Sequence, residues 1–105
     1  MKYTDTRDNT VAISLKEAVL GGMNPLTGGL YIPVDFPSLP KRLLERNSCP
    51  SFRDIAYESA KPFCEGEIED TALQQIIADC YPFSANVVPI DPTTYVLELF
   101  HGPTC

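Results

Sequence analysis

Apolar residues recur three or four positions apart between residues 52 and 63, which is the spacing of one face of an α-helix. Ser51 and Asp54 stand at the start of this stretch and form a capping pair of the Ser-x-x-acid kind. Pro62 lies near its carboxyl end, and we expect a kink or an early stop there because proline lacks an amide hydrogen. The residues of the stripe are Phe52, Ile55, Ala56, Ser59, Ala60 and Phe63.

Further helices are predicted over residues 70–80, which carry an apolar stripe, and over residues 15–20. A short helix or 3₁₀ turn is predicted within residues 39–45, where prolines break longer structure. The expected caps are Asp70 or Thr71 for the longer helix, and the capping box Ser14 with Glu17 for the shorter one, which ends at Gly21 and Gly22.

Short apolar runs bounded by glycine, proline and polar residues predict strands elsewhere in the chain. Residues 95–100 place Tyr95, Leu97 and Leu99 on one face and Val96, Glu98 and Phe100 on the other. Residues 87–90 predict an edge strand, because Pro89 cannot donate to a sheet ladder. The other predicted strands cover residues 2–4, 11–13 and 28–33, with residues 5–9 as a polar turn.

These elements follow no strict strand–helix–strand order, which favours the α+β class. We predict one small domain over residues 1–105, with about three helices and short mixed or antiparallel strands. A chain of this length builds only a thin hydrophobic core.

The charge of the chain narrows the classes of partner. Among 105 residues, 14 are acidic and 8 are basic, which gives a net charge of −6. Nucleic-acid binding needs clustered lysine and arginine, so we expect no nucleic-acid partner.

No apolar stretch is long enough to span a membrane, and the amino terminus lacks the apolar run of a signal peptide. We therefore expect a cytoplasmic protein with no membrane partner.

The cysteines are predicted to be free thiols, because nothing directs the chain to an oxidising compartment. Two disulfides, in any of three connectivities, are the alternative. Cys64 and Cys80 fall on apolar faces of predicted helices, where a free cysteine packs as a small hydrophobic residue. No metal site is expected, because Cys-x-x-Cys pairs are absent and the acidic run 65–70 lacks the ligand spacing of a calcium loop. The remaining cysteines are Cys49 and Cys105.

His101 is the only histidine, and it follows the last predicted strand. No nucleophile elbow accompanies it, so an independent Ser/His or Cys/His enzyme is disfavoured. Gly102 and Pro103 force an abrupt turn after it, and the Thr104 hydroxyl is able to hydrogen-bond an anion or a ring atom. On the residues alone, the simpler alternative is a frayed carboxyl end with an exposed histidine.

The sequence Leu-Glu-Leu-Phe-His-Gly-Pro-Thr at residues 97–104 resembles the segment of threonine synthases that leads into the lysine binding pyridoxal phosphate. Earlier segments resemble the same family in the same order, including its Gly-Gly-Leu-Tyr-x-Pro strand and its Lys-Pro-Phe-x-Gly-Glu-Ile joint between helices. These segments are residues 3–7, 14–21, 28–33, and 61–63 with 66–68.

The resemblance implies the amino-terminal domain of a fold-type-II pyridoxal-phosphate enzyme, a carbon–oxygen lyase acting on phosphates. Threonine synthases convert O-phospho-L-homoserine and water into L-threonine and phosphate in threonine biosynthesis. The resemblance further implies that residues 94–105 lead into the catalytic domain and that the family's Schiff-base lysine lies beyond Cys105. No catalytic residue is then expected in this chain, and the residues lining the cofactor site would be His101, Gly102, Pro103 and Thr104.

We therefore expect the 105 residues alone to be inactive and to hold no pyridoxal phosphate, because the lysine that anchors it is missing. In the full enzyme the expected partner is the remainder of the chain. Apolar surface at Val96 and Phe100 predicts self-association or disorder of the separate domain. Two alternatives stay open: a standalone interaction module, and a related pyridoxal-phosphate phospho-lyase acting on another phosphorylated amino acid.

Overall fold

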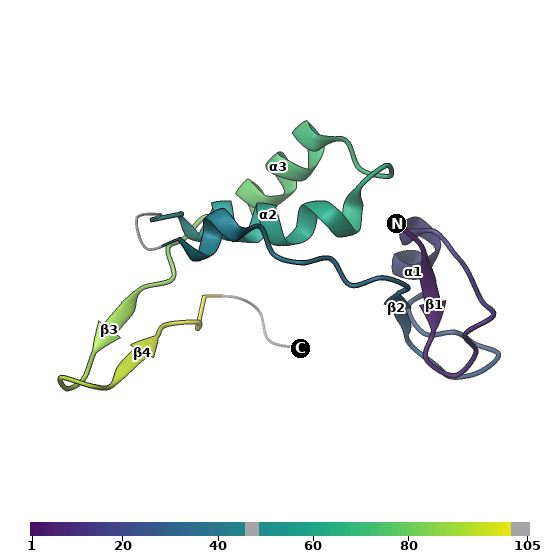
Figure 1. The fold of residues 1–105 in the computed structure, drawn as a ribbon, viewed down its shortest axis with the longest axis horizontal. Helices are drawn as coiled ribbons and strands as arrows, with labels where there is room; N and C mark the ends of the chain where they lie inside the picture. The colour runs from purple at the N-terminus through teal and green to yellow at the C-terminus, as the bar shows by residue number, and fades with distance from the viewer. Residues whose placement is uncertain (46–48, 102–105) are drawn as a thin grey trace.

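The computed structural model describes residues 1–45 and 49–101 and has an α+β fold of short elements (Figure 1). The predicted fold class is confirmed, since three α-helices combine with two antiparallel strand pairs in the described part of the chain. The elements are β1 (Tyr3–Asp5), α1 (Leu15–Gly21), β2 (Tyr31–Pro33), the 3₁₀ helix η1 (Lys41–Leu44), α2 (Phe52–Cys64), α3 (Asp70–Cys80), β3 (Val87–Pro89) and β4 (Tyr95–Leu97).

β1, α1 and β2 make up an amino-terminal unit. β1 and β2 pair antiparallel, with Tyr3 opposite Pro33 and Asp5 opposite Tyr31. The strand predicted over residues 11–13 is wrong in extent, because only an isolated bridge joins Ile13 to Tyr3. Tyr3 and Asp5 are both buried, so the alternate side chains of β1 face the interior of this unit.

Both predicted capping boxes are confirmed. The Ser14 hydroxyl accepts from the Glu17 amide and the Glu17 carboxylate accepts from the Ser14 amide, at 3.2 and 2.8 Å. Ser51 and Asp54 make the same exchange at the start of α2, at 3.2 and 2.8 Å. Of the kink or early stop expected at Pro62, the early stop is wrong, since α2 continues to Cys64 with the proline inside its last turn.

α2 and α3 pack against each other as a helical unit, and Leu73 and Ile77 of α3 are its buried side chains. The prediction of Asp70 or Thr71 as the cap of α3 is wrong, since Glu69 occupies that position and makes no side-chain capping bond. Cys80 was expected on an apolar face, but it is exposed.

The amino-terminal and helical units are joined by hydrogen bonds between residues far apart in the sequence. The Tyr3 hydroxyl donates to the Phe63 carbonyl at 3.0 Å, and the amino group of Met1 donates to the Glu65 carbonyl at 3.2 Å. These bonds hold β1 against the end of α2. Figure 1 shows the two units side by side along the long axis of the molecule.

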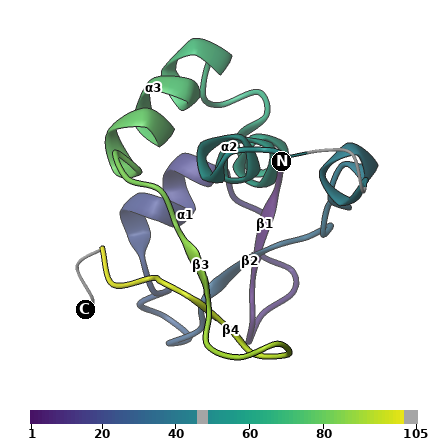
Figure 2. The same ribbon diagram turned by 90° about the vertical axis from the view of Figure 1, so that its left-hand side faces the viewer.

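β3 and β4 form a hairpin at the opposite end of the molecule from β1 and β2 (Figure 1), and Figure 2 views the molecule from the hairpin end. Val87 lies opposite Leu97 and Pro89 opposite Tyr95. The strand predicted to reach Phe100 ends at Leu97. Every residue of the two strands is exposed, so neither face of the hairpin is covered by the described part of the chain.

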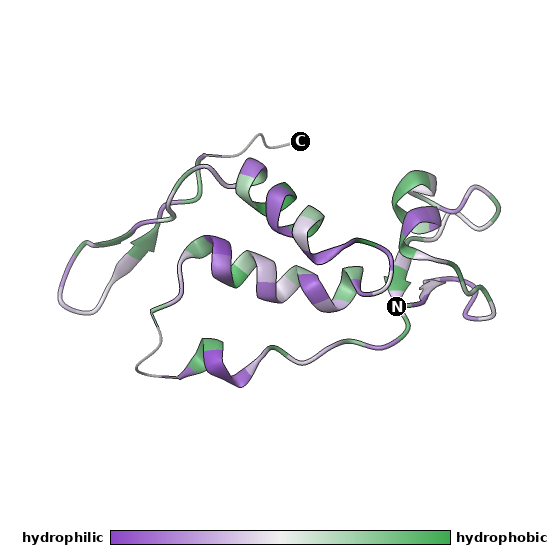
Figure 3. Cartoon of the chain, turned by 90° about the horizontal axis from the view of Figure 1, so that it is seen from above, coloured by the Kyte–Doolittle hydropathy of each residue, from purple (hydrophilic) through white to green (hydrophobic). Residues whose placement is uncertain are grey.

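The molecule is elongated, with principal extents of 50 × 27 × 25 Å and a radius of gyration of 16.9 Å. A compact domain of this length has a radius of gyration of about 13 Å. The accessible surface is 8096 Å², against about 5,800 Å² for a folded monomer of this mass. Apolar side chains therefore lie at the surface along the whole length. Figure 3 shows hydrophobic residues, in green, in every part of the chain.

The three cysteines in the described ranges are free thiols, and partial burial raises the pKa of the Cys64 thiol. Within residues 1–45 and 49–101, no helix has the length and apolar character needed to cross a membrane.

Candidate functional site

The described chain ends at His101, whose imidazole lies between two aromatic rings. Its ring centroid is 4.5 Å from that of Phe83, with the planes 13° apart, and 4.7 Å from that of Phe100, with the planes 25° apart. The residue is exposed, so solvent still reaches the ring. The other predicted site residues lie outside the described residues, and they are Gly102, Pro103 and Thr104, followed by Cys105.

Phe83 belongs to an aromatic cluster that connects His101 to the start of α2. Phe52 lies edge-on to Tyr81 with centroids 5.1 Å apart, and Phe83 is 6.1 Å from Phe52 and 6.0 Å from Tyr81. Arg53 also donates from Nε to the Tyr81 carbonyl at 2.6 Å. The sequence analysis gave these residues no part in the site. Aromatic side chains occur in both segments, 81–83 and 100–101, but their presence alone does not predict that they meet.

A separate, polar centre, which the sequence analysis missed, surrounds the buried carboxylate of Asp5. Its Oδ2 accepts from Asn24 Nδ2 and from the Thr27 hydroxyl, both at 2.6 Å. Its Oδ1 accepts from the amides of Arg7 at 2.6 Å and Asp8 at 3.2 Å. The hydrogen bond from Thr27, followed by those from Arg7, Asn24 and Asp8, lowers the pKa of the Asp5 carboxyl. The residue was predicted to open an ordinary polar turn, yet it is 2% exposed.

Gly29 lets the backbone approach this carboxylate. A Cβ atom at Gly29 would lie 2.8 Å from Asp5 Cγ, closer than real Cβ contacts come. Arg7 adds a further bond, donating from Nη1 to the Thr27 carbonyl at 2.8 Å. Gly29 has no Cβ, which leaves room for the Asp5 side chain against the backbone. This centre fixes the loop over residues 24–29 against β1.

The acidic run 65–70 acts through hydrogen bonds between the two units. Glu67 accepts from the amides of Leu15 at 2.8 Å and Lys16 at 3.1 Å, which are the first residues of α1. These two bonds lower the pKa of the Glu67 carboxyl. A carboxylate from the helical unit therefore satisfies the free amides at the start of α1.

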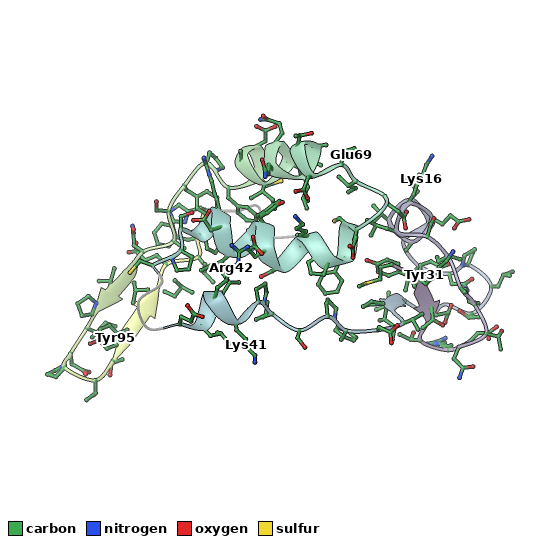
Figure 4. All side chains as sticks on the ribbon, turned by 45° about the horizontal axis from the view of Figure 1, so that its top comes forward. Lys16, Tyr31, Lys41, Arg42, Glu69 and Tyr95 are labelled. Atoms are coloured by element: carbon green, nitrogen blue, oxygen red, sulfur yellow. The ribbon has the colours of Figure 1, made fainter. Side chains whose placement is uncertain are left out.

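Three of the four described lysines are paired or point outward. Lys61 donates to Asp70 at 3.0 Å and to the Tyr57 hydroxyl at 3.1 Å, which raises the pKa of its ammonium group. Figure 4 shows Lys16 at the end opposite β3 and β4, and Lys41 pointing outward beside η1. Within the described ranges, no group of three histidine, cysteine or acidic side chains is arranged to hold a metal ion.

Comparison with known proteins places these features in one family. A family model described as "Threonine synthase N terminus" matches residues 2–81. A protein named threonine synthase from Pseudomonas aeruginosa is 30% identical over 99% of this chain and 23% of its own length. Another from Schizosaccharomyces pombe is 34% identical over 99% of this chain and 21% of its own length. The chain thus spans between a fifth and a quarter of these relatives.

Solved structures agree with the sequence relatives. A crystal structure of pyridoxal-phosphate-bound threonine synthase from Brucella melitensis superposes with a TM-score of 0.82 and 29% identity, covering 98% of this chain and 23% of that chain. The crystal structure of threonine synthase from Escherichia coli gives a TM-score of 0.82 and 28% identity over 99% of this chain and 24% of that chain. The elongated arrangement of units therefore recurs in much longer chains.

Proposed function

Because the chain belongs to the threonine synthase N-terminal family, whose model covers residues 2–81, we propose that it is the first part of an active synthase. The complete enzyme converts O-phospho-L-homoserine and water into L-threonine and phosphate, as a pyridoxal-phosphate-dependent lyase acting on a carbon–oxygen bond. It works in the cytoplasm. The observation that carries this proposal is the match to synthases over 99% of this chain in Pseudomonas aeruginosa and in Schizosaccharomyces pombe.

The chain's own contribution to the site is the segment that begins at His101. Bound pyridoxal phosphate supplies an electron sink to the substrate, and protein groups orient it. His101 fits such a role, because its stacked ring is held by Phe83 and Phe100 while remaining exposed. Under this proposal His101, Gly102, Pro103 and Thr104 line the cofactor site, and the lysine that binds the cofactor comes from the rest of the enzyme.

The 105 residues alone are proposed to be inactive. Lys61, which begins the segment resembling the family's joint between helices, is held by Asp70 and Tyr57. None of the four lysines lies in the sequence context of the family's Schiff-base lysine. Added pyridoxal phosphate is expected to keep its free absorption spectrum in the presence of this chain. A shifted cofactor band, or release of phosphate from O-phospho-L-homoserine by the 105 residues, contradicts this part of the proposal.

The complete gene product tests the activity. We expect phosphate and L-threonine to form in equal amounts from O-phospho-L-homoserine. A related phospho-lyase is the second candidate, because a relative named threonine synthase-like 2 from Xenopus laevis is 30% identical over 99% of this chain. Phosphate release from another phosphorylated amino acid, without L-threonine from O-phospho-L-homoserine, supports that candidate. Absence of turnover with either substrate class supports a standalone interaction module instead.

A further inference from the structure

The two outer edges of the β3–β4 hairpin differ in their hydrogen-bonding groups. The Ile90 amide donates to the Thr94 carbonyl, and the Glu98 amide donates to the Asn86 carbonyl, both at 2.9 Å. Hydrogen-bonded and non-bonded pairs alternate along an antiparallel ladder, so the bonded pair between these two is Val88 with Val96. The pairs of residues 87 with 97 and 89 with 95 are then non-bonded, and their backbone groups point outward.

The edge formed by β4 has a full set of outward backbone donors and acceptors, whereas the edge formed by β3 lacks one donor. On β4, Tyr95 and Leu97 each present an amide hydrogen and a carbonyl oxygen. On β3, Val87 presents both groups, but Pro89 has no amide hydrogen to present. Proline is tolerated in a sheet where its nitrogen faces away from a neighbouring strand. β3 is therefore suited to be the last strand of a sheet, and β4 to be an inner one.

Both faces of the hairpin are apolar, as in a pair of strands that is covered on both sides. Val88 and Val96 are 41% and 43% exposed, while Val87 and Leu97, whose side chains point to the other face, are 61% and 50% exposed. Neither strand carries a charged residue. Free edge strands of soluble proteins are normally blunted by charge, bulges or cover. Strands that are apolar on both faces are typical of sheets with a layer on each side.

We propose that the outward edge of β4 pairs with a strand from the remainder of the threonine synthase chain, so that β3 becomes the edge strand of a larger sheet. This inference rests on the proposed function, since it names the partner of the same domain. The remainder of the chain is the occupant because two synthase structures keep this fold over 98% and 99% of its residues, which make up 23% and 24% of their chains. A second copy of the chain is the competing occupant.

Hydrogen exchange of the complete gene product tests the pairing with an internal control. Mass spectrometry with fragmentation to single residues follows the amides of Tyr95, Leu97 and Val87. The Tyr95 and Leu97 amides are expected to exchange at least about 100-fold more slowly than the Val87 amide. Equal fast exchange at the three amides, or slow exchange at Val87 only, overturns the proposal. Slow exchange that disappears on dilution also overturns it, because it assigns the edge to a second copy.

Two proline variants provide a matched pair, since Val87 and Leu97 face each other at one non-bonded position. Leu97→Pro removes an outward amide of β4, and Val87→Pro removes the equivalent amide of β3, while neither touches the hairpin's own bonds. In the complete gene product, Leu97→Pro is expected to lower the thermal midpoint by about 5 °C or more, and Val87→Pro by less than about 2 °C. Equal losses in the two variants contradict the assignment of edges. Synthase turnover of the unmodified product is measured separately and tests the proposed function. A failure of the edge assignment is therefore distinguishable from a failure of the proposed function.

Discussion

Asp5 shows how a single carboxylate organises the amino-terminal unit. Its two oxygens take four hydrogen bonds from Arg7, Asp8, Asn24 and Thr27, and it is almost fully buried. The pKa of the folded carboxyl lies below its usual value. A group of this kind stabilises the fold above its unfolded pKa of about 3.9, and that contribution is lost as the pH falls through the folded pKa.

We predict that Asp5→Asn destabilises the protein at pH 7 and removes part of its acid sensitivity. The amide has one oxygen for four donors, so the thermal midpoint at pH 7 should fall by about 5 °C or more. Between about pH 5 and pH 2, the midpoint of the variant should fall less than that of the unmodified protein. Circular dichroism melts across this range provide the measurement. Asp35→Asn removes the same charge from an exposed position just after β2 and should change neither quantity; equal pH profiles for the two variants would falsify the role of Asp5.

Phe83 is one of the two aromatic residues that stack on the ring of His101, which is the first residue of the proposed cofactor segment. We predict that Phe83→Leu costs about 1–2 kcal/mol of stability and moves the His101 ring-proton resonances toward those of an unstacked histidine. Phe83→Tyr keeps the ring and should retain both the stability and the shifted resonances. Two-dimensional NMR follows the His101 ring directly, because it is the only histidine. Unchanged histidine resonances in Phe83→Leu would show that the stack with Phe83 does not persist in solution.

At the scale of elements, the predictions that succeeded depend on neighbours in the sequence. Ser14 and Ser51 begin helices because each meets an acidic side chain three residues later, and both helices start where expected. The start and end of α3 follow from its own apolar spacing. Such signals are contained within one or two helical turns, so a single sequence is enough to find them.

The features that escaped prediction depend on contacts across the sequence. Two hydrogen-bond partners of Asp5, Asn24 and Thr27, lie 19 and 22 positions further along the chain. No local sequence pattern predicts such contacts. Pro62 stays within α2 although it has no amide hydrogen to donate to the carbonyl four residues earlier, and its local sequence does not predict this. The stack of His101 on Phe83 joins two segments separated by β3 and β4. Of the predicted site, only His101 falls within the described residues, and its aromatic setting could not be derived from spacing.

Glu67 links two elements in a way that a substitution can isolate. It accepts from two amides at the start of α1, although it belongs to the turn between α2 and α3. We predict that Glu67→Gln lowers the thermal midpoint by about 3–8 °C, because the neutral amide is a weaker acceptor at a helix amino terminus. The loss should shrink as the pH falls through the lowered pKa of the Glu67 carboxyl, since the unmodified protein then loses the same charge.

Glu65→Gln is the matched control for this test. Glu65 is also exposed and lies two residues earlier, but only its backbone carbonyl takes part in the joint, by accepting from Met1. Its substitution should leave the thermal midpoint within about 1 °C of the unmodified value. If both variants melt at the same temperature, the joint depends on general charge in the acidic run and not on the cap that Glu67 provides.

At the scale of the whole molecule, the chain exposes more surface than a self-sufficient domain. Its accessible area of 8096 Å² exceeds the roughly 5,800 Å² expected from its mass, and only four hydrophobic side chains among the described residues are buried. The same extended arrangement recurs in synthase chains of which it covers 23% and 24%. We infer that its stability depends on cover from the remainder of such an enzyme.

The 105 residues taken alone should therefore associate through the uncovered hairpin. Val96 lies at the centre of β4 and is 43% exposed, and the neighbouring Phe100 is 75% exposed. We predict a sedimentation coefficient that rises with concentration over an approximately 100-fold range, and Val96→Lys should suppress this rise by placing a charge on the apolar face. Leu26→Lys is the control, because Leu26 is 93% exposed but lies in the amino-terminal unit. A concentration-independent monomer, or equal suppression by both variants, would show that the exposed hairpin does not drive association.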